Sequence, residues 1–259
     1  MASIKLEQYL TLQENIFSKN YDKSITTFDV DAIHDLRVSI KRLNTLYRLL
    51  ELIDSNNFVY KKNFKELRKI FKLAGIVRDY QIIEYLINQN YSQLKNINIL
   101  SNFIKGKKEI AIKQFIKSKK KLNLENVKNS ILNAKNTIAK SFDNDIDLAQ
   151  NKLIKENIDL FNKEINNNLH KARKKLKNYL YLIEMQAIDD ELKSKVFQNI
   201  KLIASYIGNW HDIIIIENEI KKYKSSHNNE INFEDIKNNN KKLKQNYLSE
   251  FYKLTKEFL

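Results

Sequence analysis

The sequence predicts an all-α fold, and three of its features carry this prediction. The chain of 259 residues contains no Pro and only three Gly, whereas roughly 13 Pro and 18 Gly would be average for this length. Tight turns between strands depend on these two residues, which argues against a sheet protein. Apolar residues also recur at helical spacing. Few, long helices are therefore expected.

The expected helices follow one another along the chain with short polar breaks. The first covers residues 4–17, and Asp29 or Asp31 caps a second that ends near residue 53. A third ends at Gly75, or packs closely at a bend there. The remaining helices are expected at residues 76–87, 97–119, 124–139, 146–188, from 189 or 190 to 208, 209–223, and from 233 to the C-terminus. The helix over 146–188 is long enough that a kink is expected in it.

A short basic pattern, His-x-x-Arg-x-x-x-Lys, occurs twice at an offset of 136 residues. Its members are His34, Arg37, Lys41, His170, Arg173 and Lys177. Each copy is followed by a second shared pattern, Gly-Ile-Val-Arg-Asp at 75–79 and Gly-Asn-Trp-His-Asp at 208–212. Two motifs in the same order at nearly the same interval predict a duplication. One domain of two repeats, about residues 5–142 and 146–258, is expected, with a pseudo-twofold axis between them.

The basic residues of each copy form a stripe beside the buried face of a helix. Each residue of a helix advances by about 100°, so Arg37, Lys41 and Arg48 lie between about 300° and 340° from His34. The apolar seams lie elsewhere on the two helices, at Leu36, Ile40, Leu43 and Tyr47 and at Ala172, Leu176, Tyr179 and Ile183. No acid stands at the i, i+3 and i+7 positions of either stripe. The stripes therefore predict a groove or pore lined by basic side chains.

Basic character recurs at two further positions of the repeats. Arg68 and Lys201 lie seven residues before the two glycines, and Lys62 and Lys195 lie six residues earlier again. Four basic residues at equivalent places extend the predicted surface to the next helix of each half. The alternative is that they are ordinary solvated lysines and arginines of a Lys-rich chain.

The overall charge points to a polyanionic partner. Lys and Arg number 46 against 31 Asp and Glu, a formal charge of +15 with a pI near 9.6. The absence of Cys excludes disulfides and thiolate metal sites. The first residues lack a signal-peptide pattern, and the longest apolar run, 213–216, is far below the ~20 residues of a membrane span. A soluble, cytoplasmic protein is expected.

The two motifs and their second copies resemble the CHAD domain, the conserved histidine α-helical domain, over about residues 5–258. The resemblance implies two helical bundles related by a pseudo-twofold axis, with a basic central groove or pore. It also implies binding of inorganic polyphosphate without catalysis and without a cofactor, often at polyphosphate granules. Enzymes of polyphosphate metabolism are possible partners.

The candidate polyphosphate-binding residues combine the motif matches with the basic stripes. They are His34, Arg37, Lys41, Arg48, Lys62, Arg68, Arg78, His170, Arg173, Lys177, Lys195, Lys201 and His211. Asp79 and Asp212 are expected to orient neighbouring basic groups or to cap the helix after the glycine. The sequence departs from the family pattern at Asn44 and Leu180, where Arg is frequent, and at His211, which also stands in place of Arg.

Two other classes of function were weighed against polyphosphate binding. Polyphosphate carries about one charge per phosphoryl unit and no bases, so it requires aligned Lys and Arg but no stacking platform. Nucleic-acid binding would call for exposed aromatics among the basic residues, although weak non-specific binding follows from charge alone. A metal or phosphoryl-transfer site at His34, His170 and His211 lacks a His pair at i, i+4 and an acidic cluster. A non-enzymatic protein without a metal is expected.

Overall fold

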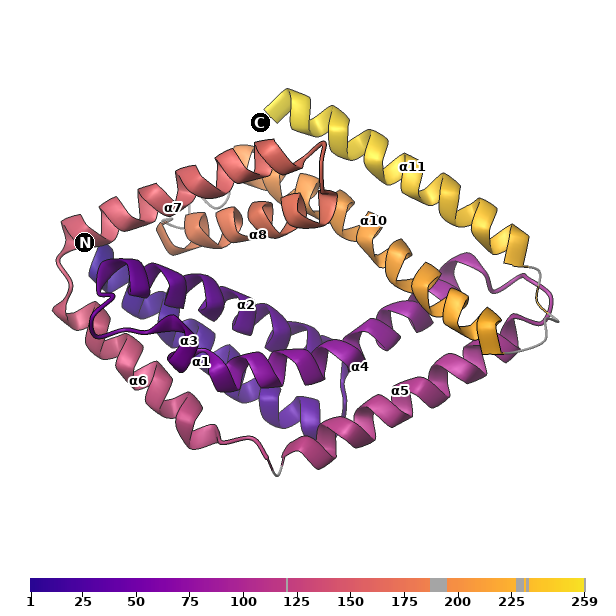
Figure 1. Ribbon diagram of the computed structural model, residues 1–259, viewed down its shortest axis with the longest axis horizontal. Helices are drawn as coiled ribbons and strands as arrows, with labels where there is room; N and C mark the ends of the chain where they lie inside the picture. The colour runs from indigo at the N-terminus through magenta and orange to yellow at the C-terminus, as the bar shows by residue number, and fades with distance from the viewer. Residues whose placement is uncertain (120, 187–194, 227–230, 232, 259) are drawn as a thin grey trace. The chain divides into compact units, whose positions relative to one another are not determined.

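Helices make up the regular structure of the described residues, which are 1–119, 121–186, 195–226, 231 and 233–258 of the computed structural model (Figure 1). The helices are α1 Ala2–Thr26, α2 Val30–Ile53, α3 Tyr60–Asn63, α4 Lys65–Asn90, α5 Ile97–Lys119, α6 Leu124–Lys140, α7 Asp143–Glu164, α8 Leu169–Gln186, α10 Lys195–Ser226 and α11 Phe233–Phe258. No strand occurs among these residues, so the all-α prediction is confirmed. In the same ranges no helix is long and apolar enough to cross a membrane.

The two motif glycines lie inside long helices. The prediction that helices end at Gly75 and Gly208 is wrong, because α4 and α10 run through them. A glycine inside a helix costs only about 1 kcal/mol relative to Ala. Apolar residues next to these glycines, Ala74, Val77 and Ile207, are fully buried, and burial of one such side chain contributes more than the glycine costs.

The prediction of one kinked helix over residues 146–188 is also wrong, because the chain breaks there into two helices. α7 ends at Glu164 and α8 begins at Leu169, with residues 165–168 between them. The side chain of Asn168 caps α8, since its Oδ1 accepts a 3.0 Å hydrogen bond from the Lys171 amide. The predicted helix start at 189 or 190 lies outside the described residues.

Asp29 begins the helix that carries the first basic stripe. Its Oδ1 accepts a 2.8 Å hydrogen bond from the Ala32 amide at the N-terminus of α2, and Lys23 lies 3.1 Å from the same atom. The hydrogen bond from Ala32, and then Lys23, lower the pKa of the Asp29 carboxyl. Of the two predicted caps, Asp29 is therefore the one used. It sets the residue at which α2, the helix that carries His34, begins.

The chain forms two compact units, and neither is a continuous stretch of sequence. The first unit comprises Met1–Gly75 and Lys113–Leu192, and the second comprises Ile76–Ile112 and Lys193–Leu259. Each unit takes segments from both predicted repeats, and the two helices with the His motif, α2 and α8, belong to the first. The repeats and their pseudo-twofold axis stay a prediction.

The core of the first unit includes the predicted seam of α2. In this unit α1 packs along α2, and α7 packs along α8. The four seam residues have no exposed surface, as predicted: Leu36, Ile40, Leu43 and Tyr47. The Tyr47 hydroxyl is 3.0 Å from the hydroxyl oxygen of Ser130 on α6, which satisfies the buried phenol.

The seam of α8 is only partly as predicted. Ala172 and Leu176 are buried, whereas Tyr179 and Ile183 are half-buried. Leu180 is buried instead, with 2% of its surface exposed. α8 packs against α2 as well as α7. The buried arc of this helix is therefore wider than the single predicted apolar seam.

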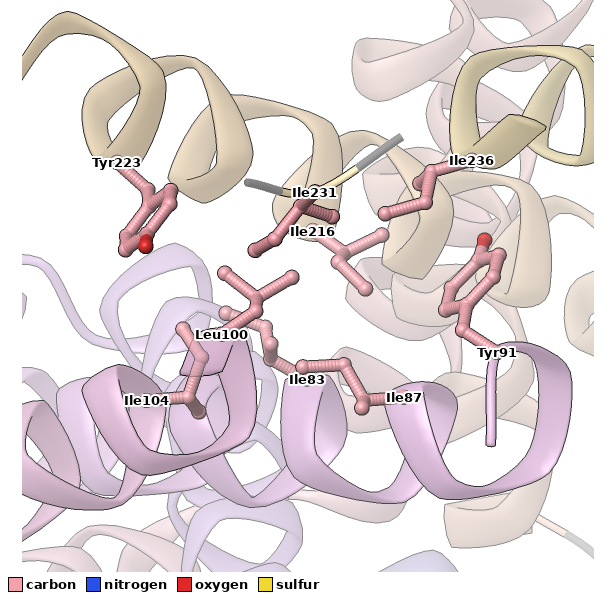
Figure 2. Close-up of a cluster of buried hydrophobic side chains, with 9 residues drawn as sticks. All are labelled: Ile83, Ile87, Tyr91, Leu100, Ile104, Ile216, Tyr223, Ile231 and Ile236. Atoms are coloured by element: carbon pink, nitrogen blue, oxygen red, sulfur yellow. The ribbon is translucent and has the colours of Figure 1, made fainter. Parts of the chain in front are cut away.

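The core of the second unit is an aliphatic cluster with two tyrosines (Figure 2). α4, α5, α10 and α11 contribute Ile83, Ile87, Leu100, Ile104, Ile216, Tyr223 and Ile236, and Tyr91, directly after α4, and Ile231 join them. The hydroxyl of Tyr91 donates a short hydrogen bond to Oδ1 of the buried Asn240 on α11. This bond and the packing of α10 on α11 hold α11 to the unit.

Candidate functional site

Four of the candidate residues lie along α2. His34 and Arg48 are exposed, and Arg37 and Lys41 are half-buried. The differences in exposure follow from the directions in which the side chains leave the helix axis, because the stripe lies beside the buried seam of the same helix. Side chains at such a border can contact neighbouring helices with their stems and solvent with their charged ends.

Arg37 lies against α4, where it contacts Phe71 in two ways. Its Nη1 donates a 2.7 Å hydrogen bond to the Phe71 carbonyl oxygen. Its guanidinium carbon lies 4.2 Å from the centroid of the Phe71 ring, within the range of a cation–π contact. Lys41 Nζ lies 5.8 Å from the same ring. Phe71 therefore aligns two consecutive members of the first motif.

Gly75 leaves the space that the Arg37 guanidinium occupies. A Cβ atom on Gly75 would lie 2.4 Å from Nη1 of Arg37, well inside van der Waals contact. Gly75 is buried and has an ordinary helical backbone. The predicted close approach at this glycine is confirmed, and the group that approaches is the motif arginine.

Tyr60 brings together two further candidates, from α2 and α4. The guanidinium carbon of Arg48 lies 4.9 Å from the Tyr60 ring centroid, and that of Arg68 lies 5.8 Å from it. Nη2 of Arg68 also donates a 3.3 Å hydrogen bond to the Tyr60 hydroxyl. In the described part of the chain, neither arginine forms an ion pair with a carboxylate. We call Arg48, Arg68 and Tyr60 the Tyr60 cluster.

The Tyr60 ring is itself held in place. Its hydroxyl donates a 2.6 Å hydrogen bond to Oδ1 of Asn44, and the ring stacks on Phe64 at a centroid distance of 5.4 Å. Asn44 is the residue that departs from the family pattern, and it supports the aromatic ring under the two arginines. The sequence analysis missed Tyr60, and its only signal was its place eight residues before Arg68.

The second copy of the motif lies on α8 of the same unit. His170, Arg173 and Lys177 are half-buried. Burial lowers the pKa of His170 from its usual value of 6.5, and the nearby charges of Lys174 and Arg173 lower it further. Nε of Arg173 is buried without a hydrogen-bond partner among the described residues. Arg173 therefore differs from its counterpart Arg37, and the position equivalent to Phe71 is Ala204.

α2 and α8 contact each other through polar side chains that the sequence analysis did not single out. Arg42 makes a bidentate ion pair with Glu184, with Nε–Oε2 and Nη2–Oε1 distances of 2.8 and 3.1 Å. Its guanidinium carbon lies 5.7 Å from the Tyr181 ring centroid. Thr45 Oγ1 and Asn178 Oδ1 are 3.5 Å apart.

These contacts are reciprocal between the two motif helices. Arg42 and Asn178 each lie eight residues after the motif His, and Thr45 and Tyr181 each lie eleven residues after it. Position eight of each helix thus contacts position eleven of the other. A twofold axis produces contacts of this kind, so the pattern supports the predicted relation between α2 and α8.

The other candidates are more dispersed. Lys62 is exposed on α3 of the first unit. Six belong to the second unit, where Lys195 and Lys201 are exposed and the others are half-buried: Arg78, Asp79, Lys195, Lys201, His211 and Asp212. Nζ of Lys201 lies 4.6 Å from the Phe197 ring centroid, and Arg68 lies 5.8 Å from Phe64 at the equivalent positions of the first repeat.

The structure brings no potential metal ligands together in the described ranges. Among those residues, no three His, Asp or Glu side chains form a group that could hold a metal ion. The side chains gathered on α2, α3 and α4 are instead guanidinium, ammonium and aromatic groups. Such a surface can bind anions through charge and through the forked N–H donors of Arg.

Comparison with known proteins identifies a family for the chain. The family model described as CHAD domain matches residues 8–220. The solved structure described as the CHAD domain from the plant Ricinus communis superposes with a TM-score of 0.66 at 12% identity, covering 96% of this chain and 86% of that one. No curated protein matches the sequence. At this identity the solved structure supports the fold alone, whereas the family model covers most of the chain. The chain therefore belongs to the CHAD domain family.

Proposed function

We propose that the chain binds inorganic polyphosphate and does not chemically alter it. The Tyr60 cluster carries this proposal, because two guanidinium groups from different helices lie on one ring without a carboxylate partner in the described structure. The membership of the CHAD domain family and the net charge of +15 support it. Polyphosphate is a line of phosphoryl groups with about one charge each, and an array of cations matches it without any group that recognises bases.

The physical advantage of the Tyr60 cluster is preorganisation. A free arginine side chain loses rotamer freedom when it binds an anion, at a cost of about 0.5–1.5 kcal/mol. Contact with the Tyr60 ring, which Asn44 and Phe64 hold in place, removes part of that cost before the ligand arrives. Arg48 and Arg68 therefore bind an anion with less loss of entropy than isolated surface arginines do.

The proposed binding surface extends beyond this cluster. On the same unit it includes the rest of the stripe of α2, Lys62, and the second motif on α8: His34, Arg37, Lys41, His170, Arg173 and Lys177. Arg78, Lys195, Lys201 and His211 of the second unit are further proposed contacts. Asp79 and Asp212 are proposed to orient neighbouring basic groups. A cytoplasmic location at polyphosphate granules, with enzymes of polyphosphate metabolism nearby, belongs to the same proposal.

The experiment compares polyphosphate with double-stranded DNA at matched phosphate concentration and near-physiological salt. The test variant is Arg48→Ala, Arg68→Ala. The control is Lys128→Ala, Lys140→Ala, which removes the same charge from exposed positions of α6 in the same unit. We expect the test variant to lose about tenfold or more in polyphosphate affinity, because one hydrogen bond to a charged group contributes about 1.5–3 kcal/mol.

The salt dependence gives a second readout. Each lost phosphate contact should reduce the slope of log affinity against log salt by about 0.7–0.9, and the control should keep the parent slope. An equal loss of polyphosphate affinity in the test and control variants would show that only the net charge of the protein matters. Equal affinity for DNA and polyphosphate would reject the specific ligand, and release of orthophosphate from the polymer would reject the absence of catalysis.

A further inference from the structure

A groove between α10 and α11 of the second unit combines an apolar floor with lysine walls. Its volume is about 480 Å³, within the range of about 300–1,000 Å³ typical of small-molecule sites. Most of it lies on α11, which begins at Phe233, after the end of the CHAD family match at residue 220. No residue of the groove is among the candidates for polyphosphate binding.

The apolar residues that line the groove are Ile220, Phe233 and Ile236, and Ile220 and Phe233 form its open floor. Ile236 has 1% of its surface exposed and points into the buried cluster of the second unit (Figure 2). Ile220 and Phe233 are only partly buried, and they pack on the outside of the same cluster. An apolar surface therefore remains open at the bottom of the groove, and an aromatic ring is part of it.

The walls carry more positive than negative charge. Five lysines and two glutamates line the groove. Lys244 Nζ lies 2.7 Å from Oε1 of Glu217, and Lys237 Nζ lies 3.2 Å from Oε1 of Glu234, so both glutamates are already paired. In the ranges that the structure describes, no ion pair forms at the other three lysines, Lys221, Lys224 and Lys241.

The geometry selects the class of ligand. Lys224 Nζ lies 5.9 Å from the Phe233 ring centroid, so an ammonium group stands beside the aromatic part of the floor. A fatty acid carries one charge and would leave two of the three lysines without a partner. An inorganic phosphate chain would leave the apolar floor bare. A molecule that joins an aromatic ring to several negative charges uses both parts of the groove.

We propose that this groove binds a nucleoside di- or triphosphate. The base stacks on Phe233 beside Ile220, and the phosphates lie among Lys221, Lys224 and Lys241. Stacking of a base on an aromatic side chain tolerates any base, so the groove recognises the ring and the phosphates and not a particular nucleotide. This site shares no residue with the proposed polyphosphate surface.

Calorimetric titration of the full chain with ADP and with pyrophosphate tests the proposal. The two ligands carry the same number of phosphoryl groups, so a difference in their affinities reports the nucleoside. We expect ADP to bind at least about fivefold more tightly, the lower limit of what a base–aromatic stack contributes. Phe233→Leu should remove most of this preference, and Lys221→Gln, Lys241→Gln should weaken both ligands.

Two control variants locate the binding. Lys242→Gln, Lys253→Gln changes exposed lysines of α11 outside the groove and should leave ADP affinity unchanged. Arg48→Ala, Arg68→Ala should also leave it unchanged, whether or not polyphosphate binds at the first unit. Pyrophosphate binding as tight as ADP binding, an ADP preference that survives Phe233→Leu, or loss of ADP binding in either control would overturn the proposal, as would the absence of ADP binding.

Discussion

Replacing Gly75 with Ala should destabilise the protein, although Ala is the better helix former. In the middle of α4 the exchange alone is worth about 0.8–1.0 kcal/mol in favour of folding. The new Cβ atom, however, would lie 2.4 Å from Nη1 of Arg37, so the guanidinium has to leave its place. It then loses its hydrogen bond to the Phe71 carbonyl and its contact with the Phe71 ring.

The magnitude follows from these two lost contacts. A hydrogen bond with a charged partner contributes about 1.5–3 kcal/mol, and a cation–π contact contributes about 0.5–1 kcal/mol. After subtraction of the gain in helix propensity, Gly75→Ala should cost up to about 3 kcal/mol in the parent chain, the value that applies when the shifted guanidinium loses both contacts. In an Arg37→Ala background the guanidinium is absent, and Gly75→Ala should raise the free energy of unfolding by about 1 kcal/mol.

Urea unfolding of the four chains of this double-mutant cycle, followed by circular dichroism, measures the coupling. Gly106→Ala in α5 is the matched control, because a Cβ at Gly106 would meet nothing within 4 Å. It should stabilise both backgrounds by about 1 kcal/mol. If Gly75→Ala stabilises the parent chain as much as the Arg37→Ala chain, the guanidinium does not depend on the glycine and the interpretation of this motif is wrong.

Two further predictions concern α8. A bound polyanion should raise the lowered pKa of His170, so binding takes up a proton and polyphosphate affinity should rise as the pH falls below about 6.5. The trend should weaken in His170→Gln, and an unchanged trend in that variant would contradict this prediction. Glu184→Gln should cost about 2–3 kcal/mol in urea unfolding, because Arg42, with 26% of its side chain exposed, loses its carboxylate. Glu234→Gln, at an exposed pair, should cost less than about 0.5 kcal/mol, and equal costs would reject the argument.

Helical periodicity predicted the side chains of α2 well. The spacing of Leu36, Ile40 and Leu43 gave the buried face, and all three have no exposed surface. Periodicity describes one helix relative to its own axis, so it also gave the direction of Arg37 and Lys41. It contains no information about the neighbouring helix, and for this reason Phe71 and Tyr60, which position the basic groups, were not found.

The errors in helix ends have a common cause. A single glycine does not end a helix in this chain, whereas a run of asparagines does. Gly75 serves a side chain of another helix and leaves α4 intact, whereas the asparagines before α8 offer alternative hydrogen bonds to the backbone and end α7. Local propensity could not decide the case of Gly75, because its deciding contacts come from a residue 38 positions earlier.

Each of the two units is built from two separate stretches of the chain, and this has a consequence for synthesis on the ribosome. Residues 76–112 of the second unit emerge while the first unit still lacks its later half. Ser3 on α1, for example, bonds to Asp143, which lies 140 positions later. At about 5–20 residues per second, α1 waits roughly 7–30 s for this partner. α2 can cover one side of α1 early, but the side that packs against α6, α7 and α8 is uncovered during that time, so the nascent chain should depend on chaperones more than one whose units are finished one after the other.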